Sequence, residues 1–92
     1  MQASDTLISL RGELDLSNAD ALRTSLRTVS GPAVVDLSDV TYLDSAALYE
    51  LAALRRRVGS VVLVVSSPQI RRTLEIVGFP KVFRVVETRE LV

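Results

Sequence analysis

The chain has 92 residues and a formal net charge of zero, and it contains neither cysteine nor histidine. Their absence excludes disulfides, thiol nucleophiles, Cys/His zinc sites and an imidazole general base, and with them most common hydrolytic chemistry. Hydrophobic residues make up 48% of the sequence, far more than a disordered tail contains. We therefore expect one domain over residues 1–92 that folds alone, is not an enzyme and uses no metal or cofactor.

Neither a secretion signal nor a membrane span is visible in the sequence. Met1–Ser9 lacks a basic segment followed by an apolar one, and the longest apolar run is Val61–Val65. We expect a cytoplasmic protein that does not insert into membranes. The charges are unevenly distributed, because residues 1–50 carry eight acids against three arginines and residues 51–92 carry eight bases against three acids. This asymmetry indicates an oriented electrostatic surface.

The first half of the chain predicts a strand, a helix and a second strand. Thr6–Arg11 is a β-branched and apolar stretch closed by a glycine, which is typical of a strand. Ser17, followed three residues later by Asp20, resembles a capping box at the start of a helix. Apolar residues then recur at helical spacing: Ala19, Leu22, Leu26 and Val29. Ala33–Leu37 is nearly all apolar, as expected for a strand covered on both faces.

A second helix is predicted from Asp44 or Ser45 to the glycine at position 59. Its apolar side carries Leu48, Leu51, Ala52 and Val58. Arg55–Arg57 occupy its last turn, where the helix dipole favours cations. Val61–Val65 is entirely apolar and predicts a third buried strand.

The last part of the chain predicts a third helix and a final strand. Ser67 and Pro68 suit the N-cap and first position of a helix, and Gly78 suits its C-cap. The predicted inward residues of this helix are Ile70, Leu74 and Val77. Val82–Val86 is the predicted last strand, with a helical turn expected from Glu87.

Alternation of strands and helices predicts an α/β fold with a mostly parallel sheet of four to five strands and helices packed on it. In such a sheet the loops that follow the strands gather at the carboxyl edge, where function tends to lie. Those loops are Gly12–Ser17, Ser38–Ser45 and Ser66–Pro68. They place Glu13, Asp15, Asp39 and Asp44 at this edge. The edge is therefore expected to be acidic and to suit a basic partner surface.

Ser45 follows Asp44 at the predicted entrance to the second helix. A helix N-cap accounts for a serine here on structural grounds alone. A phosphorylation site is the functional interpretation, because a phosphate would meet free backbone N–H groups and the positive end of the helix dipole. Such a modification would act on partner binding without unfolding the domain.

Three segments carry a resemblance to a known family: GELDLSNADAL (12–22), VVDLSDVTYLDSAALYEL (34–51) and SSPQIRRTLEIVGF (66–79). They resemble the STAS-domain family of anti-sigma factor antagonists over nearly the whole chain. The resemblance implies a small α/β domain that binds an anti-sigma factor, itself a serine kinase, and so frees a sigma factor. It further implies that the kinase phosphorylates the serine of an Asp-Ser-Ser/Thr-Gly-Leu motif and breaks the complex, and that a phosphatase restores it.

Carried over by this resemblance, Ser45 is the phosphoacceptor, Asp44 the preceding acid, and Asp15 the acid of the loop that faces the kinase. The sequence departs from the motif at Ala46 and Ala47, where the family has Ser or Thr and then Gly. Only five residues precede the first predicted strand, so most of the family's first edge strand is expected to be missing. The final helix is expected to be short or absent.

Other signals are weaker. Tyr49 lies beside the apolar stripe of the second helix, and both partial burial and a role as an exposed interface anchor fit that position. Tyr42 is expected to pack in its loop, and Phe79 and Phe83 in the core. Without a basic excess or an aromatic platform, no nucleic-acid binding is expected.

The predicted partner-binding residues are thus Asp15, Asp44, Ser45 and Tyr49, and the protein is expected to be a monomer or weak homodimer. The leading functional hypothesis is an anti-sigma factor antagonist, switched off by phosphorylation. The alternative is a non-switching adaptor, similar to single-domain STAS subunits of membrane lipid transporters. An enzyme is disfavoured because Ser45 has no candidate base other than a carboxylate.

Overall fold

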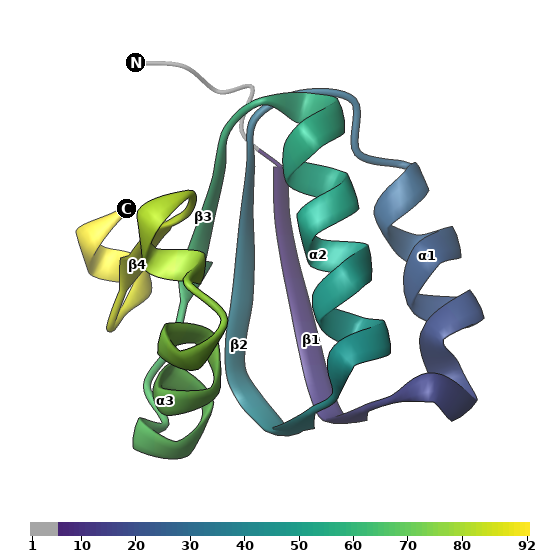
Figure 1. The fold of residues 1–92 in the computed structure, drawn as a ribbon. Helices are drawn as coiled ribbons and strands as arrows, with labels where there is room; N and C mark the ends of the chain where they lie inside the picture. The colour runs from purple at the N-terminus through teal and green to yellow at the C-terminus, as the bar shows by residue number, and fades with distance from the viewer. Residues whose placement is uncertain (1–5) are drawn as a thin grey trace.

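The computed structural model describes residues 6–92, and the predicted edge segment Met1–Asp5 lies outside that range. Four strands form one parallel sheet in chain order: β1 (Thr6–Leu14), β2 (Ala33–Leu43), β3 (Val61–Val64) and β4 (Arg84–Val86). The helices α1 (Ala19–Arg27), α2 (Ser45–Val58) and α3 (Pro68–Ile76) connect them (Figure 1). Short 3-10 turns follow as η1 (Leu16–Asn18), η2 (Phe79–Lys81) and η3 (Arg89–Leu91). The predicted α/β class with a parallel sheet is confirmed.

The main hydrophobic core lies on one face of the sheet. Alternate residues of a strand point to the same face, and on this face β2 contributes Ala33, Val35 and Leu37, while β3 and the residue after it contribute Val61, Leu63 and Val65. All three helices pack into this core, with Leu22 and Leu26 from α1, Leu51 and Leu54 from α2, and Ile70 and Leu74 from α3. Phe79 and Phe83 belong to this core, as predicted, and their ring centroids lie 4.7 Å apart.

The opposite face of the sheet has a much smaller apolar cluster, formed by Val34, Val64 and Val86. The end of the chain folds back over this face through an ion pair between Arg89 and Asp36. Arg89 also donates a hydrogen bond to Ser9 Oγ at 2.6 Å, and the Ser38 N–H donates to Asp36 Oδ1 at 2.8 Å. Asp36 is nearly buried, so these bonds replace the water that its carboxylate has lost.

Both strands that lead to the carboxyl edge are longer than predicted. The sequence places their ends at Arg11 and Leu37, whereas β1 continues to Leu14 and β2 to Leu43. The two strands remain paired throughout, with register shifts after Ser9 and after Gly12. Gly12 has φ +76°, a backbone conformation that other residues rarely adopt. Polar residues at Ser38 and Asp39 resemble turn chemistry, but pairing with β1 keeps this segment extended.

The capping box predicted at Ser17 and Asp20 is wrong. The capping box is formed by Asp15, as the N-cap, and Asn18, and it lies at the start of η1 and not of α1. Asn18 then precedes α1 without forming a side-chain cap. At the other helices Ser67 caps α3 and Gly59 ends α2 with φ +85°, as predicted. The predicted C-cap of α3 at Gly78 is wrong, because Val77 is the C-cap and Gly78 precedes η2.

Three apolar or aromatic residues are more exposed than the sequence suggests. Val77 is 48% exposed, because α3 ends at Ile76 and Val77 lies beyond the last helical residue. Val82 precedes the last strand, which begins only at Arg84, and is also exposed. Tyr42 lies in β2 with half of its surface in solvent, so the prediction that it packs in a loop is wrong.

Candidate functional site

Two loops meet at the carboxyl edge of β1 and β2. The Asp44 N–H donates to the Leu14 carbonyl at 3.1 Å, so the ends of the two strands stay joined. The Leu16 N–H in turn donates to Asp44 Oδ2 at 2.9 Å. The segment after β1 is therefore fixed against the start of α2.

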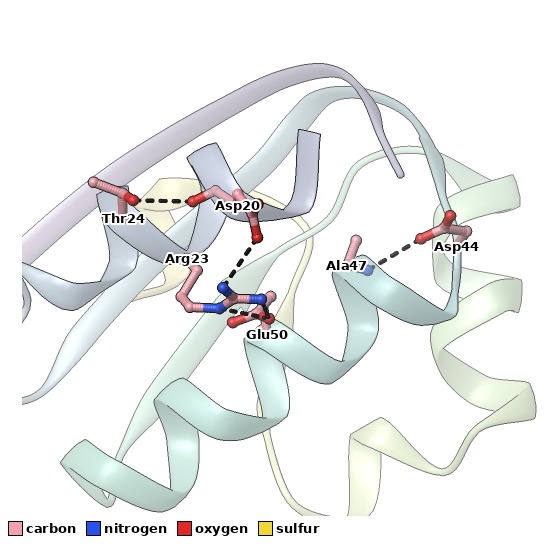
Figure 2. Close-up of polar contacts among 6 residues, drawn as sticks. All are labelled: Asp20, Arg23, Thr24, Asp44, Ala47 and Glu50. Carbon is pink, nitrogen blue, oxygen red and sulfur yellow. Dashed lines mark hydrogen bonds and ion pairs between the residues drawn. The ribbon is translucent and has the colours of Figure 1, made fainter. Parts of the chain in front are cut away.

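Asp44 holds this junction with both of its carboxylate oxygens. Besides accepting from Leu16, it accepts from the Ala47 N–H at 3.1 Å through Oδ1 and so forms the N-cap of α2. The cap satisfies one of the free N–H groups of the first turn and places negative charge at the positive end of the helix dipole. Figure 2 shows this bond at the start of α2. Asp44 is thus a structural cap as well as a predicted contact residue.

Asp15 plays the corresponding part at η1. Its carboxylate accepts from the Ser17 N–H at 3.0 Å, and its own N–H donates to Asn18 Oδ1 at 2.9 Å. Asn18 Nδ2 donates back to the Glu13 carbonyl at 2.7 Å, which ties the turn to β1. The side chain of Asp15 remains half-buried. Both predicted acids therefore lie at the same edge, each at the start of a helical segment.

Ser45 is the first residue of α2 and is exposed. The N-cap interpretation of this serine is wrong, since Asp44 fills that position. Ala47, which stands where the family motif has glycine, is fully buried in the main core. Its methyl group therefore points away from the surface that carries Ser45. The helical backbone at this position requires no glycine.

The rest of the predicted acidic edge is only partly assembled. Glu13 is exposed in β1 close to the edge, whereas Asp39 lies further back within β2, opposite Arg11 on β1. The edge itself therefore carries Glu13, Asp15 and Asp44.

Two exposed apolar or aromatic side chains flank Ser45. Tyr49 is 63% exposed and follows Ser45 by four residues, so both lie on the same side of α2. Leu16 on η1 is 77% exposed and is held beside Asp44 by its backbone N–H. Sequence reasoning missed Leu16, because a single leucine in a polar loop has no periodicity to mark it. The only signal was the Asp15–Asn18 capping spacing around it.

A buried carboxylate joins α1 to α2 behind this surface. Glu50 is 6% exposed and accepts two hydrogen bonds from Arg23, each at 3.2 Å. Arg23 also pairs with Asp20 at 3.0 Å, as Figure 2 shows. The hydrogen bonds and charge of Glu50, with a smaller effect from Asp20, raise the pKa of Arg23 above its ordinary value. The network fixes the position of α1 relative to the first turns of α2.

The carboxylate next to Ser45 is already engaged by backbone groups. Both Asp44 oxygens accept backbone N–H groups, so the carboxylate beside Ser45 is not directed at its hydroxyl as a general base. Within residues 6–92 no cluster of three or more acidic side chains could hold a metal ion. Nor does this part of the chain contain a helix with the length and apolar character needed to cross a membrane.

Comparison with known proteins agrees with this architecture. The family model of the STAS domain matches residues 2–91. The anti-sigma-F factor antagonist RsfB of Mycobacterium tuberculosis is 35% identical over 89 residues, which cover 89% of this chain and 73% of that protein. A STAS-domain protein of Pseudomonas aeruginosa is 41% identical over 56 residues, which cover 56% of this chain and 55% of that protein.

Solved structures show the same fold. An anti-sigma factor antagonist from Mycobacterium paratuberculosis superposes with a TM-score of 0.88 at 29% identity, covering 98% of this chain and 83% of that one. The anti-sigma factor antagonist SpoIIAA superposes with a TM-score of 0.72 at 16% identity, covering 98% and 86%. The carboxyl-edge site thus stands on a fold shared with these proteins, and the chain belongs to the STAS domain family.

Proposed function

We propose that the protein is an anti-sigma factor antagonist that binds an anti-sigma factor through the carboxyl edge around Ser45 and so releases a sigma factor. The observation that carries the proposal is an exposed serine as the first residue of α2, flanked by the N-cap Asp44 and by exposed Leu16 and Tyr49. Relatives named as anti-sigma factor antagonists support the class of partner. Exposed aromatic and aliphatic anchors beside acids are typical of a protein interface.

We further propose that the partner is a serine kinase that phosphorylates Ser45 and that a phosphatase reverses this step. A phosphate adds a charge of about −1.5 to −2 at neutral pH. It would stand beside Asp44, whose oxygens already accept the N–H groups of Ala47 and Leu16. Burying this dianion and the neighbouring carboxylate against a partner is costly. The complex therefore dissociates on phosphorylation. The domain itself stays folded, because Ser45 is exposed at the start of α2 and the phosphate remains in solvent.

The test is a titration of the purified anti-sigma factor into wild type, Ser45→Asp and Ser45→Ala, with a melting curve and a kinase reaction for each. We expect Ser45→Asp to bind at least about tenfold more weakly, or about 1.4 kcal/mol, with an unchanged melting temperature. Ser45→Ala binds like wild type and is not labelled. Normal binding by Ser45→Asp, with equal labelling of Ser45→Ala, would instead assign the protein to the non-switching STAS adaptors.

A second measurement tests the acidic edge. Asp15→Asn keeps an oxygen that accepts the capping N–H bond of Ser17 and removes the charge. Asp44→Asn also removes the charge and keeps an oxygen for the Ala47 N–H, but its amide nitrogen cannot accept the Leu16 N–H. Glu75→Gln is the matched control, because Glu75 is exposed near the C-terminal end of α3. We expect both Asp variants to bind the anti-sigma factor more weakly than wild type at low salt. Their binding should also depend less on the salt concentration than that of wild type. Equal, small effects from all three would place the interface elsewhere.

A further inference from the structure

A groove between α1 and α2 lies beside the Ser45 surface. It has a volume of about 230 Å³ and is lined by Arg23, Leu26 and Arg27 from α1 and by Tyr49, Glu50, Ala53, Leu54 and Arg57 from α2. Three of its lining side chains are arginines, and the only acid among them is the buried Glu50. The groove is therefore basic, although the nearby carboxyl edge is acidic.

The spacing along α2 connects the two surfaces. Ser45, Tyr49, Ala53 and Arg57 follow one another at intervals of four residues and so lie along one side of the helix. Tyr49, Ala53 and Arg57 line the groove. Ser45 is exposed at the start of the helix, next to the acidic carboxyl edge. A partner segment that crosses Ser45 and continues along α2 therefore enters the groove.

The charges inside the groove are not equally available. Arg23 is held by Glu50 and Asp20. Arg57 donates to the carbonyls of Leu26 and Val29 and so satisfies the end of α1. Arg27 is exposed and pairs with no carboxylate among residues 6–92. Among the arginines that line the groove, Arg27 is therefore the one whose side chain is available to pair with an acidic group of another molecule.

We propose that this groove takes an acidic segment of the protein partner, and that its basic charge fixes the direction in which the partner lies across Ser45. The inference rests on the proposed partner site at Ser45, since both surfaces share α2. A partner with basic groups over Asp15 and Asp44 and acidic groups over Arg27 is attracted in one orientation and repelled in the reverse one. Tyr49 lies between the two ends as the apolar contact.

The first experiment uses Arg27→Glu, with Arg56→Glu as the matched control, because Arg56 is exposed on α2 but does not line the groove. In titrations with the anti-sigma factor, we expect Arg27→Glu to raise Kd at least about tenfold and Arg56→Glu to change it less than about twofold. The effect of Arg27→Glu shrinks at high salt. Equal increases in Kd for both variants would overturn the proposal that the groove binds the partner, because they would reflect only the overall change in charge.

The second experiment does not depend on the anti-sigma factor. Amide chemical shifts of the isotope-labelled domain are followed while a short blocked peptide of glutamate, alanine and leucine is added, with its lysine counterpart as the control. We expect salt-sensitive shifts at Tyr49, Ala53 and Arg27 with the acidic peptide only, and their loss in Arg27→Glu. The absence of localised shifts, or identical shifts with inorganic phosphate, would overturn an acidic protein segment as the occupant.

The two experiments separate the two proposals. If wild type binds no anti-sigma factor but the acidic peptide still maps to the groove, the proposed function fails and the groove stands. If the anti-sigma factor binds and responds to Ser45→Asp but neither to Arg27→Glu nor at the groove amides, the function stands and the groove proposal is wrong.

Discussion

The two faces of the sheet are held in different ways. On the helix-covered face, side chains from α1, α2 and α3 pack with β2 and β3 into one continuous apolar core. On the opposite face, a cluster built on three valines is closed by the chain end through Arg89, Asp36 and Ser9. The first face relies on apolar area and the second on a few polar bonds. The face that positions the Ser45 site is therefore the more robust of the two.

The two faces should differ most in the stability lost when a buried side chain is shortened to alanine. Leu51, fully buried on α2, belongs to the helix-covered face, and Val64, 1% exposed on β3, belongs to the other. We expect Leu51→Ala to cost about 3 to 4 kcal/mol of unfolding free energy and Val64→Ala about 2 kcal/mol. Urea unfolding measures both. Equal losses would show that the two faces are packed equally well.

The polar closure should have a smaller effect. Arg89 is about half exposed, whereas its partner Asp36 is nearly buried. We expect Arg89→Ala to cost about 1 to 2 kcal/mol, because Asp36 loses a charged donor but keeps the Ser38 N–H. Replacing the pair together, as Asp36→Val with Arg89→Ala, should recover much of that loss. A double variant less stable than the single one would mean that the valine cluster cannot accept another apolar side chain.

The smallest expected effect is in the pH dependence of stability. Burial alone would raise the pKa of Asp36, but hydrogen bonds from Ser38 and Arg89 outweigh burial and lower it. The unfolded chain, with an ordinary aspartate pKa of about 3.9, binds this proton more readily than the folded domain does. The stabilisation is therefore complete above about pH 4 and is lost as the pH falls through the lowered pKa.

Melting curves between about pH 6 and pH 2 test this effect. We expect Arg89→Ala to lose less stability over the acid range than wild type, since it lacks the bond that lowers the pKa. Parallel acid profiles of the two proteins would show that the Arg89 pair does not govern the titration of Asp36.

The sequence predicted the layers of the fold better than the extent of its strands. The apolar runs at Val61–Val65 and Ala33–Leu37 identified the central strands because a buried parallel strand is apolar on both sides. The second half of β2 was missed because only Val40 and Leu43 are buried there, and polar residues between them resemble a loop. Pairing with β1, which is a long-range contact, keeps this half extended.

At the candidate site, the position of side chains was more predictable than their bonding. Asp15, Asp44 and Ser45 lie at the carboxyl edge as expected, because α/β connectivity places loop residues there. Their part in partner binding stays a prediction. The use of both Asp44 oxygens as structural acceptors depends on how the two loops meet, which no local pattern specifies.

The irregular pairing of β1 also bears on solubility. In the sheet formed by residues 6–92, β1 is nine residues long and lies at one edge, whereas β4 at the other edge has only three. A long, regular edge strand is a template on which other chains can add strands and aggregate. The register shifts around Gly12, with the exposed charges of Arg11 and Glu13, disturb that template. The distortion lies in the half of β1 that leads to the candidate site, and it works against ordered aggregation along this edge.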